Sequence, residues 1–154
     1  MAARARLGHM EHALKEARAA AARGEVPVGA VLVNPEGEIV AAAGNRTRER
    51  ADPSAHAEML VIRDATARLD SERLIGHDLY VTLEPCPMCA AVISFARIRR
   101  LYYAASDPKS GGVEHGARVF SHATCHHRPD LYPGLGEDEA KALLQTFFQD
   151  RRPD

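Results

Sequence analysis

Apolar residues near the start of the chain recur every three or four positions, which is the spacing of one buried face of a helix. Met10, Leu14 and Ala17 follow this spacing with charged residues between them, and Gly24 marks the end of the segment. The pattern predicts a helix that begins near Met10 and ends before Gly24. Residues 1–9 precede it and are expected to form a flexible extension.

Short apolar runs, separated by turns and by further helical segments, follow this helix. The run over residues 26–33 is rich in β-branched side chains and predicts a buried strand, with Pro27 near its start, where a missing N–H costs least. A turn over residues 34–37 predicts that residues 38–43 pair with this strand in antiparallel fashion. The remaining predicted elements are helices over residues 55–68, 86–95 and 137–149, strands over residues 79–83 and 98–104, and irregular segments over residues 44–54 and 106–136.

The alternation of helices and strands predicts a single α/β domain over residues 10–152. One sheet is expected to carry helices on both faces, which makes a three-layer α/β/α arrangement. Where a helix connects two strands, we expect a right-handed crossover between parallel strands. No internal repeat, low-complexity tract or linker interrupts the sequence.

Composition and charge narrow the class of protein. The 154 residues suffice for one domain with a buried core, and 45% apolar and 27% charged residues are ordinary values for a globular protein. A net charge of −1 argues against a general nucleic-acid coat protein, although it leaves room for a local basic patch. Neither a signal-peptide core nor an apolar run of membrane-spanning length is present, so we expect a soluble cytoplasmic protein without a membrane partner.

Three cysteines are present, and two of them form the segment Cys86-Pro-Met-Cys89. A small, odd number argues against a disulfide scaffold and favours a reducing compartment, in which the pair serves as metal ligands or as a redox centre. Residues three apart share one face of a helix, so both thiols can hold one ion, and a helix N-terminus favours their ionisation. His56 is the expected third ligand.

The number of expected ligands indicates a catalytic metal site. A structural zinc ion usually has four protein ligands, whereas a catalytic one keeps one position open. Two thiolates offset the charge of Zn²⁺ and weaken its Lewis acidity, which makes a nearby base more necessary. Glu58 is the candidate base. It can lie beside the ion together with His56 only if both residues belong to the first turn of a helix.

Each part of this constellation has a simpler interpretation when it is taken alone. An isolated His-x-Glu is common by chance, and Cys86-Pro-Met-Cys89 alone also resembles a thioredoxin-like redox centre. The upstream pair of His56 and Glu58, together with Pro85 directly before the first cysteine, favours zinc.

The combination His-x-Glu…Pro-Cys-x-x-Cys is the signature of the cytidine/deoxycytidylate deaminase superfamily. Within it, the chain resembles the bacterial tRNA-specific adenosine deaminases from about Met10 to Arg152. The segments that carry this resemblance are Glu25-Val-Pro-Val-Gly-Ala30, Gly44-Asn-Arg46, Ala55-His-Ala-Glu58, Leu79-Tyr-Val-Thr-Leu-Glu-Pro-Cys86 and Ala96-Arg-Ile98. The resemblance implies a cytidine-deaminase-like fold with a central mixed sheet of about five strands. It also implies hydrolytic conversion of adenosine to inosine at the wobble position of a tRNA, with an arginine tRNA as the expected substrate.

The same resemblance implies that His56, Cys86 and Cys89 bind one Zn²⁺ per subunit and that Glu58 transfers protons. The active unit is implied to be a homodimer that binds the anticodon stem-loop of the tRNA. Asn45 is implied to hydrogen-bond the flipped adenine. The other implied substrate contacts are Val26 and Pro27 in the pocket wall, the backbone around Leu83 and Glu84, Asp107 and Lys109 in a loop beside the flipped base, and Phe148, Arg151 and Arg152 at a C-terminal helix.

Two of these assignments have structural alternatives. Gly44-Asn45 is a common turn pair, so Asn45 taken alone indicates a structural role. Phe147 and Phe148 are adjacent, so only one of the two rings can face the core squarely if the segment is helical.

Two arginine clusters and one segment rich in histidine lie outside the motifs. The arginines within residues 46–50 are expected to contact RNA phosphates, whereas those within residues 97–100 fit phosphate binding and a solvated face equally well. Residues 122–127 contain three histidines and a cysteine, and we expect a surface loop near the RNA rather than a second metal site.

The closest alternative function is a deaminase of the same fold that acts on a free base such as guanine or cytosine, since it would use the same zinc ligands and Glu58. Asn45, the loop at residues 107–109 and the arginines of the C-terminal helix favour RNA. A zinc-stabilised RNA-binding module without turnover would not need Glu58. A thiol oxidoreductase would not purify with stoichiometric zinc.

Overall fold

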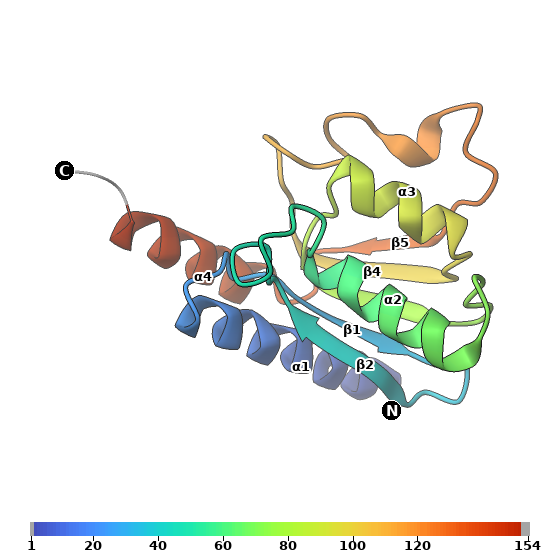
Figure 1. Ribbon diagram of the computed structural model, residues 1–154, viewed down its shortest axis with the longest axis horizontal. Coiled ribbons are helices and arrows are strands. Elements are labelled where there is room, and N and C mark those ends of the chain that lie inside the picture. Colours follow the sequence, from blue (N-terminus) through green and yellow to red (C-terminus); the bar gives the residue numbers. More distant parts are fainter. Residues whose placement is uncertain (1, 152–154) are drawn as a thin grey trace.

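The computed structural model describes residues 2–151. Helices and strands alternate along the chain (Figure 1). In chain order they are α1 (Ala2–Ala22), β1 (Gly29–Val33), β2 (Ile39–Gly44), α2 (Ala57–Leu69), β3 (Asp78–Leu83), α3 (Pro87–Phe95), β4 (Arg100–Ala105), the 3₁₀ helix η1 (Val119–Ser121), β5 (Asp130–Pro133) and α4 (Glu137–Asp150). Every helix and strand predicted from the sequence is present, although several boundaries differ.

The strands form one mixed sheet in the order β2-β1-β3-β4-β5. Strand β1 is antiparallel to both β2 and β3, whereas β3, β4 and β5 run parallel to one another. The β3–α3–β4 connection therefore joins neighbouring parallel strands, as predicted. The expected mixed sheet of about five strands is confirmed.

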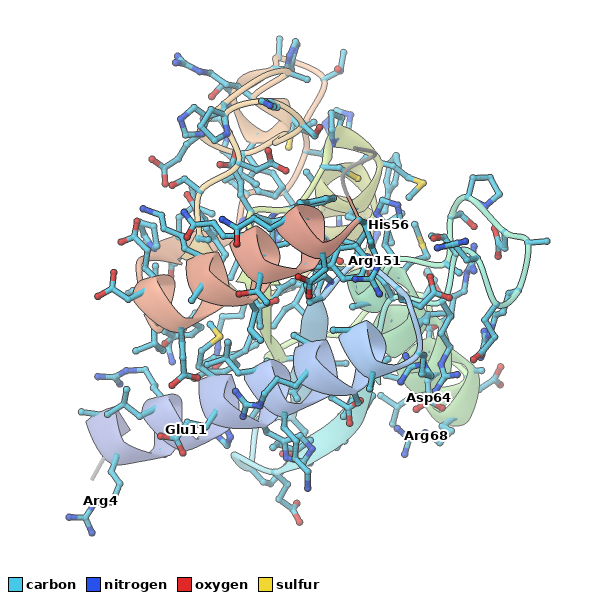
Figure 2. The ribbon with its side chains drawn as sticks, turned by 90° about the vertical axis from the view of Figure 1, so that its left-hand side faces the viewer. Arg4, Glu11, His56, Asp64, Arg68 and Arg151 are labelled. Carbon is cyan, nitrogen blue, oxygen red and sulfur yellow. The ribbon has the colours of Figure 1, made fainter. Side chains whose placement is uncertain are left out.

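The helices form two layers, with α1 and α4 on one face of the sheet and α2 and α3 on the other (Figure 1). Figure 2 shows α1 and α4 side by side on their face. Because successive side chains of a strand point to opposite faces, β1 contributes to both cores. Ala30 and Leu32 pack beneath α2 and α3, while Val31 and Val33 pack beneath α1 and α4. The predicted three-layer α/β/α arrangement is thus confirmed.

Helix α1 begins at Ala2 rather than near Met10, so residues 2–9 of the predicted flexible extension belong to the helix. Alanine, arginine and leucine dominate this segment, and their high helix propensity extends the helix beyond its buried face. The buried residues of α1 start only at Met10, which is why the apolar spacing detects the later turns alone. The division between residues 1–9 and a domain over residues 10–152 stays a prediction. Within residues 2–151, no helix combines the length and the apolar character that crossing a bilayer requires.

The sequence predicts that Val26 and Pro27 belong to the first strand. In the structure β1 starts only at Gly29, so both residues lie in the loop before it. Pro27 has no N–H to contribute to a ladder, and the N–H of Val28 donates to the carbonyl of Val26 at 2.8 Å, which makes a tight turn instead. The N–H of Gly29 then donates to Thr82 Oγ1 at 3.1 Å, which begins the contact with the sheet.

Strand β5 and the 3₁₀ helix η1 lie within the segment predicted to be irregular. All four residues of β5 are exposed, so the strand lacks the alternating buried positions that reveal a strand in a sequence. It is held in the sheet by its pairing with β4 and by the ring of Tyr132, which stacks on Tyr102 with ring centroids 4.7 Å apart.

Gly29→Ala is expected to destabilise the protein, because the backbone of α1 passes directly over this residue. A Cβ atom at position 29 would lie 2.5 Å from Ala17 N and would also clash with the carbonyl oxygen of Ala13. We expect a loss of at least about 1–3 kcal/mol in the free energy of unfolding, measured by denaturant titration.

Gly8→Ala is the matched control for this substitution. Nothing lies within 4 Å of a Cβ atom at Gly8, and its position inside α1 predicts a gain of about 0.5–1 kcal/mol in the free energy of unfolding. A neutral Gly29→Ala variant would contradict the close packing of α1 on β1. A destabilising Gly8→Ala variant would contradict the helical structure of residues 2–9.

Candidate active site

Helices α2 and α3 begin close to each other, and a candidate metal ligand stands at the start of each. His56 is the N-cap of α2 and Cys86 is the N-cap of α3, with extended backbone at both residues. Neither side chain makes the hydrogen bond to helix N–H groups that an N-cap usually makes, so both remain available to a metal ion. Cys89 follows in the first turn of α3, after Pro87, whose missing N–H is tolerated at a first helical position.

The three ligand atoms fit a zinc ion. They lie within 4.8 Å of one another, and His56 Nδ1 is 3.6 Å from Cys86 Sγ and 3.5 Å from Cys89 Sγ. A tetrahedral zinc ion, with bonds of about 2.1 Å to nitrogen and about 2.3 Å to sulfur, requires N···S separations of about 3.6 Å. In the part of the chain that the structure describes, no other group of three His, Cys, Asp or Glu side chains converges in this way.

Hydrogen bonds within this cluster shift the pKa values of its members. A hydrogen bond from Cys89, with a smaller contribution from His56, lowers the pKa of the Cys86 thiol to about 4 despite its burial. The pKa of the Cys89 thiol is raised, because it is the donor in that hydrogen bond and because it is buried. The hydrogen bond to Cys86 also raises the pKa of His56. These hydrogen bonds favour the thiolate form of Cys86 and the protonated form of Cys89, so metal binding has to displace the proton of Cys89.

Glu58 lies in the first turn of α2, and its side chain is buried. This placement meets the condition under which His56 and Glu58 both lie beside one ion. Burial penalises the carboxylate and raises the pKa of Glu58 to about 7. A carboxyl group with a pKa near neutrality can accept a proton and return it, which suits a general base that later acts as an acid.

Asn45 holds the first turn of α2 in place. Its Oδ1 atom accepts a hydrogen bond from the N–H of Ala57 at 2.8 Å, and Ala57 stands between His56 and Glu58. Asn45 is buried, with 9% of the residue exposed. The structural role that the turn pair suggests is therefore present, and it acts directly on the segment that carries the metal ligand and the base.

A cavity of about 1000 Å³ is formed by the loop before β1, the end of β3, the loop after β4 and helix α4. Its volume lies at the upper end of the range of about 300–1000 Å³ that ligand sites occupy. The predicted substrate residues in its lining are Val26, Leu83, Asp107, Lys109, Phe148 and Arg151. The metal ligands and Glu58 are not part of the lining, and the segment from Leu83 to Cys86 links the cavity to the metal site.

Three other predicted substrate residues, Asn45, Pro27 and Glu84, are buried and lie outside this lining. The prediction for Arg152 falls outside the described residues. The structure therefore does not bring all of the predicted substrate residues into the lining of one cavity.

The end of α4 separates the roles of its two aromatic residues. Phe147 is buried, whereas Phe148 is 50% exposed and lines the cavity, which confirms that only one ring of the pair faces the core. The guanidinium of Arg151 stacks on the ring of Phe147, 3.7 Å from its centroid. This stacking holds Arg151 at the rim of the cavity.

The two arginine clusters outside the motifs form ion pairs with acidic residues of the same chain. In the second arginine cluster, Arg99 donates two hydrogen bonds of 3.0 Å to the carboxylate of Asp78, so it supports the pairing of β3 and β4. In the first cluster, Arg46 forms a surface ion pair with Glu49. The side chains of residues 122–127 do not bring three potential ligand atoms together in the structure.

Two buried carboxylates near the cavity are not evident from the sequence. Glu25 accepts hydrogen bonds from the N–H groups of Arg48 (3.1 Å) and Glu49 (2.8 Å). The side chain of Glu84, whose backbone alone was assigned to the site, accepts four backbone hydrogen bonds from the loop at residues 107–115. Although burial raises the pKa of the Glu84 carboxyl, the hydrogen bonds from this loop lower it overall. An acidic residue beside an apolar run is the only sequence signal for either role.

Residues 4–105 match the family model of the cytidine and deoxycytidylate deaminase zinc-binding region. Together with the His56, Cys86 and Cys89 cluster, this match defines a zinc-dependent deaminase, and the chain belongs to the cytidine and deoxycytidylate deaminase family. The predicted zinc cofactor is thereby confirmed.

Comparison with individual proteins shows which members of the family the chain resembles. The chain is 62% identical over 145 residues to the tRNA-specific adenosine deaminase of Agrobacterium fabrum, which covers 94% of this chain and 95% of that protein. A solved structure from a study of A-to-I editing by tRNA:A34 deaminases at the wobble position of transfer RNA matches with a TM-score of 0.87 and 63% identity, over 89% of this chain and 99% of the other. A guanine deaminase from Nitrosomonas europaea matches with a TM-score of 0.78 and 25% identity, over 92% and 83% of the two chains. The predicted resemblance to the tRNA-specific adenosine deaminases and the predicted deaminase fold are confirmed.

Cys86→Ala is expected to lose zinc and stability together, because it removes one of three protein ligands. The purified variant should contain much less than one zinc ion per chain by elemental analysis, and it should melt at a lower temperature than the wild type. Cys125→Ala is the matched control, since Cys125 is the third cysteine and lies outside the cluster, and it should keep the wild-type zinc content. Full zinc content in Cys86→Ala would remove Cys86 from the ligand set.

Proposed function

We propose that this chain deaminates adenosine to inosine at the wobble position of a tRNA, within the anticodon stem-loop. Similarity over nearly the whole chain to a tRNA-specific adenosine deaminase supports the substrate. The observation that carries the proposal is the cavity of about 1000 Å³, because it gathers predicted RNA-contacting residues from four separate parts of the chain. A single free base would leave most of such a volume unfilled.

The proposed contacts follow from the chemistry of each side chain. Lys109 and Arg151 would neutralise phosphates, and the exposed ring of Phe148 would stack on a base. Asn45, whose Oδ1 is engaged by Ala57, would donate a hydrogen bond to the flipped adenine through its Nδ2 amide. The remaining proposed contacts are Val26 and Pro27, the backbone of Leu83 and Glu84, Asp107 and Arg152.

The proposed reaction exchanges the amino group on adenine C6 for an oxygen atom of water, so that adenosine and water give inosine and ammonia. Bound zinc supplies the Lewis acidity that makes water nucleophilic at neutral pH. The Glu58 carboxylate would accept one proton of the attacking water and pass it to N1 of the ring as the C6–O bond forms. It would then accept the proton of the new C6 hydroxyl group and deliver it to the departing amine as the C6–N bond breaks. Its burial, which brings its pKa to about 7, suits both directions of transfer.

We also propose an arginine tRNA as the substrate, a homodimer as the active unit and a cytoplasmic location. The resemblance to the family supports all three. Apolar side chains exposed on α3, with Phe95 at 73% and Met88 at 36%, offer a surface on which a second copy of the chain can pack.

A deaminase of a free base is the second candidate, and the specific observation in its favour is the similarity to a guanine deaminase. The two functions are distinguished by offering the zinc-loaded protein an anticodon stem-loop with a wobble adenosine and, separately, guanine, cytosine and cytidine. Ammonia release and inosine are then measured. Inosine formed only in the RNA supports the proposal, whereas deamination of a free base alone overturns it.

Glu58→Gln is expected to retain one zinc ion per chain while losing activity by at least about 10²–10⁴-fold, because the amide has the same shape but cannot accept a proton. The rate of inosine formation and the zinc content are measured on the same preparation. Glu72→Gln, an exposed position after α2, is the control and should match the wild type in both. Substantial activity in a zinc-loaded Glu58→Gln variant would exclude the proton-transfer role.

Lys109→Ala is expected to weaken binding of the stem-loop and to reduce its dependence on salt. The slope of log K against log[salt] is negative, and loss of one phosphate contact should reduce its magnitude by about 0.7–0.9. Lys15→Ala removes the same charge from an exposed position on α1 and should leave that slope unchanged. An unchanged slope in Lys109→Ala would show that this side chain contacts no phosphate.

A further inference from the structure

The loop at residues 106–115, which follows β4, forms one wall of the cavity and contains only turns and bends. Asp107, Lys109 and Ser110 belong to the lining. Within the loop, the carboxylate of Asp107 accepts hydrogen bonds from the N–H groups of Lys109 (3.2 Å) and Ser110 (3.0 Å), which fixes the local turn. The position of the turn relative to the metal site depends on a contact outside the loop.

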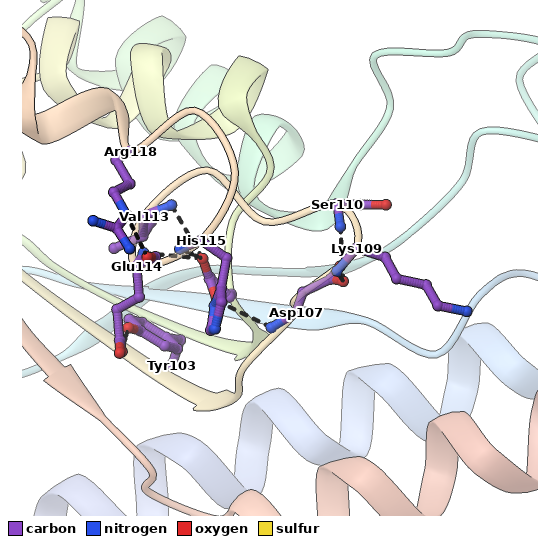
Figure 3. Close-up of polar contacts among 9 residues, drawn as sticks. Tyr103, Asp107, Lys109, Ser110, Val113, Glu114, His115 and Arg118 are labelled. Atoms are coloured by element: carbon purple, nitrogen blue, oxygen red, sulfur yellow. Dashed lines mark hydrogen bonds and ion pairs between the residues drawn. The ribbon is translucent and has the colours of Figure 1, made fainter.

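The carboxylate of Glu84 supplies that contact. Its Oε1 atom accepts a hydrogen bond from the N–H of Asp107 (3.0 Å) and lies 2.8 Å from His115 Nδ1. Its Oε2 atom accepts hydrogen bonds from the N–H groups of Val113 (3.1 Å), Glu114 (3.0 Å) and His115 (3.0 Å). Figure 3 shows Asp107, Val113, Glu114 and His115 of this loop with their polar contacts as dashed lines. Both ends of the loop are thus tied to a single side chain.

Only a carboxylate can make this set of contacts. The side chain of Glu84 is 0% exposed, and no Lys or Arg within residues 2–151 forms an ion pair with it, so its polar partners are backbone N–H groups and the ring of His115. A glutamine would keep one acceptor oxygen but would present an NH₂ group to the remaining N–H donors. Those donors would be left unpaired in a buried place, which is costly.

Close packing transmits the position of this loop to the metal-binding segment. A Cβ atom at Gly111 would clash with Glu84 Oε2 and would lie 2.5 Å from the carbonyl oxygen of Asp107. A Cβ atom at Gly112 would lie 2.5 Å from Pro87 N and 2.8 Å from the carbonyl carbon of Cys86. Gly112 therefore lets the loop rest directly on the backbone that begins α3, and Gly111 lets it close over the Glu84 carboxylate.

We infer that the Glu84 side chain is a positioning residue, which holds the loop at residues 106–115 against the start of α3 so that Asp107 and Lys109 face the RNA. This role rests on the proposed function, because it assigns the loop to an RNA substrate. Glu84 acts through the loop and does not touch the reacting atoms with its carboxylate. Its loss should therefore affect substrate binding more than the chemical step.

The first measurement is hydrogen exchange of backbone amides in the zinc-loaded protein, with zinc content and melting temperature recorded for each variant. In Glu84→Gln, the amides of residues 107–115 should exchange at least about tenfold faster than in the wild type, as expected for loss of hydrogen bonds to a charged group. Glu25→Gln is the matched control, since it removes an equally buried carboxylate that binds Arg48 and Glu49 instead. It should leave exchange at residues 107–115 unchanged.

The second measurement is the steady-state kinetics of deamination of the anticodon stem-loop. Glu84→Gln should raise KM by at least about tenfold while kcat falls by less than about threefold, because the loop and not the base is displaced. Gly111→Ala disturbs the same contact without changing a charge and should give the same split between KM and kcat. It also replaces Glu84→Gln if that variant does not fold.

Unchanged exchange at residues 107–115 in the folded variants would overturn the inference, whatever the enzyme acts on. Faster exchange with an unchanged KM for RNA would also overturn it, since the carboxylate would then serve the structure alone. If the wild-type protein does not deaminate the RNA, the proposed function fails and the positioning of RNA fails with it. The exchange measurement still decides whether Glu84 anchors the loop.

Discussion

The packing of two helix N-termini against one end of the sheet is the constraint on which the site depends. His56 and Cys86 are N-cap residues, so the positions of their backbones are set by how α2 and α3 rest on the sheet. Ala57 and Ala90 are fully buried in the core that these helices share, and their small side chains let the helices approach the sheet closely. Three ligand atoms can therefore lie at zinc-binding distances as a consequence of core packing.

The pKa values of two acidic groups at this end of the sheet, the Cys86 thiol and the Glu58 carboxyl, are shifted in opposite directions. Partial positive charge at the start of α3 and hydrogen bonds from its neighbours favour the thiolate of Cys86. Burial without comparable hydrogen bonding disfavours the carboxylate of Glu58. Cys86 thus favours the anionic form that binds metal, whereas Glu58 can both accept and release a proton. Neighbouring groups with pKa values moved apart are typical of sites that carry out acid–base chemistry.

Local patterns in the sequence predict the metal site and most of the sheet, because the residues involved are close in the chain or alternate in burial. His56 and Glu58 are two residues apart, and Cys86 and Cys89 share one helical turn, so the two pairs together indicate a zinc site although neither does so alone. The anchoring role of Glu84 could not be predicted in this way, since its partners lie 23 to 31 residues away. Strand β5 could not be predicted because an exposed edge strand needs no apolar alternation. The start of α1 could not be predicted from apolar spacing because helix propensity, and not burial, extends the helix there.

Strand β5 ends the sheet opposite β2, with all of its side chains exposed. Such a strand normally offers unpaired N–H and C=O groups on which a strand of another molecule can be added. Here the strand is only four residues long, its last residue is Pro133, which has no N–H, and its first is the charged Asp130. These features block further strand addition at this side of the sheet. A second molecule is therefore not expected to extend the sheet from this edge, which is the step by which fibrils grow.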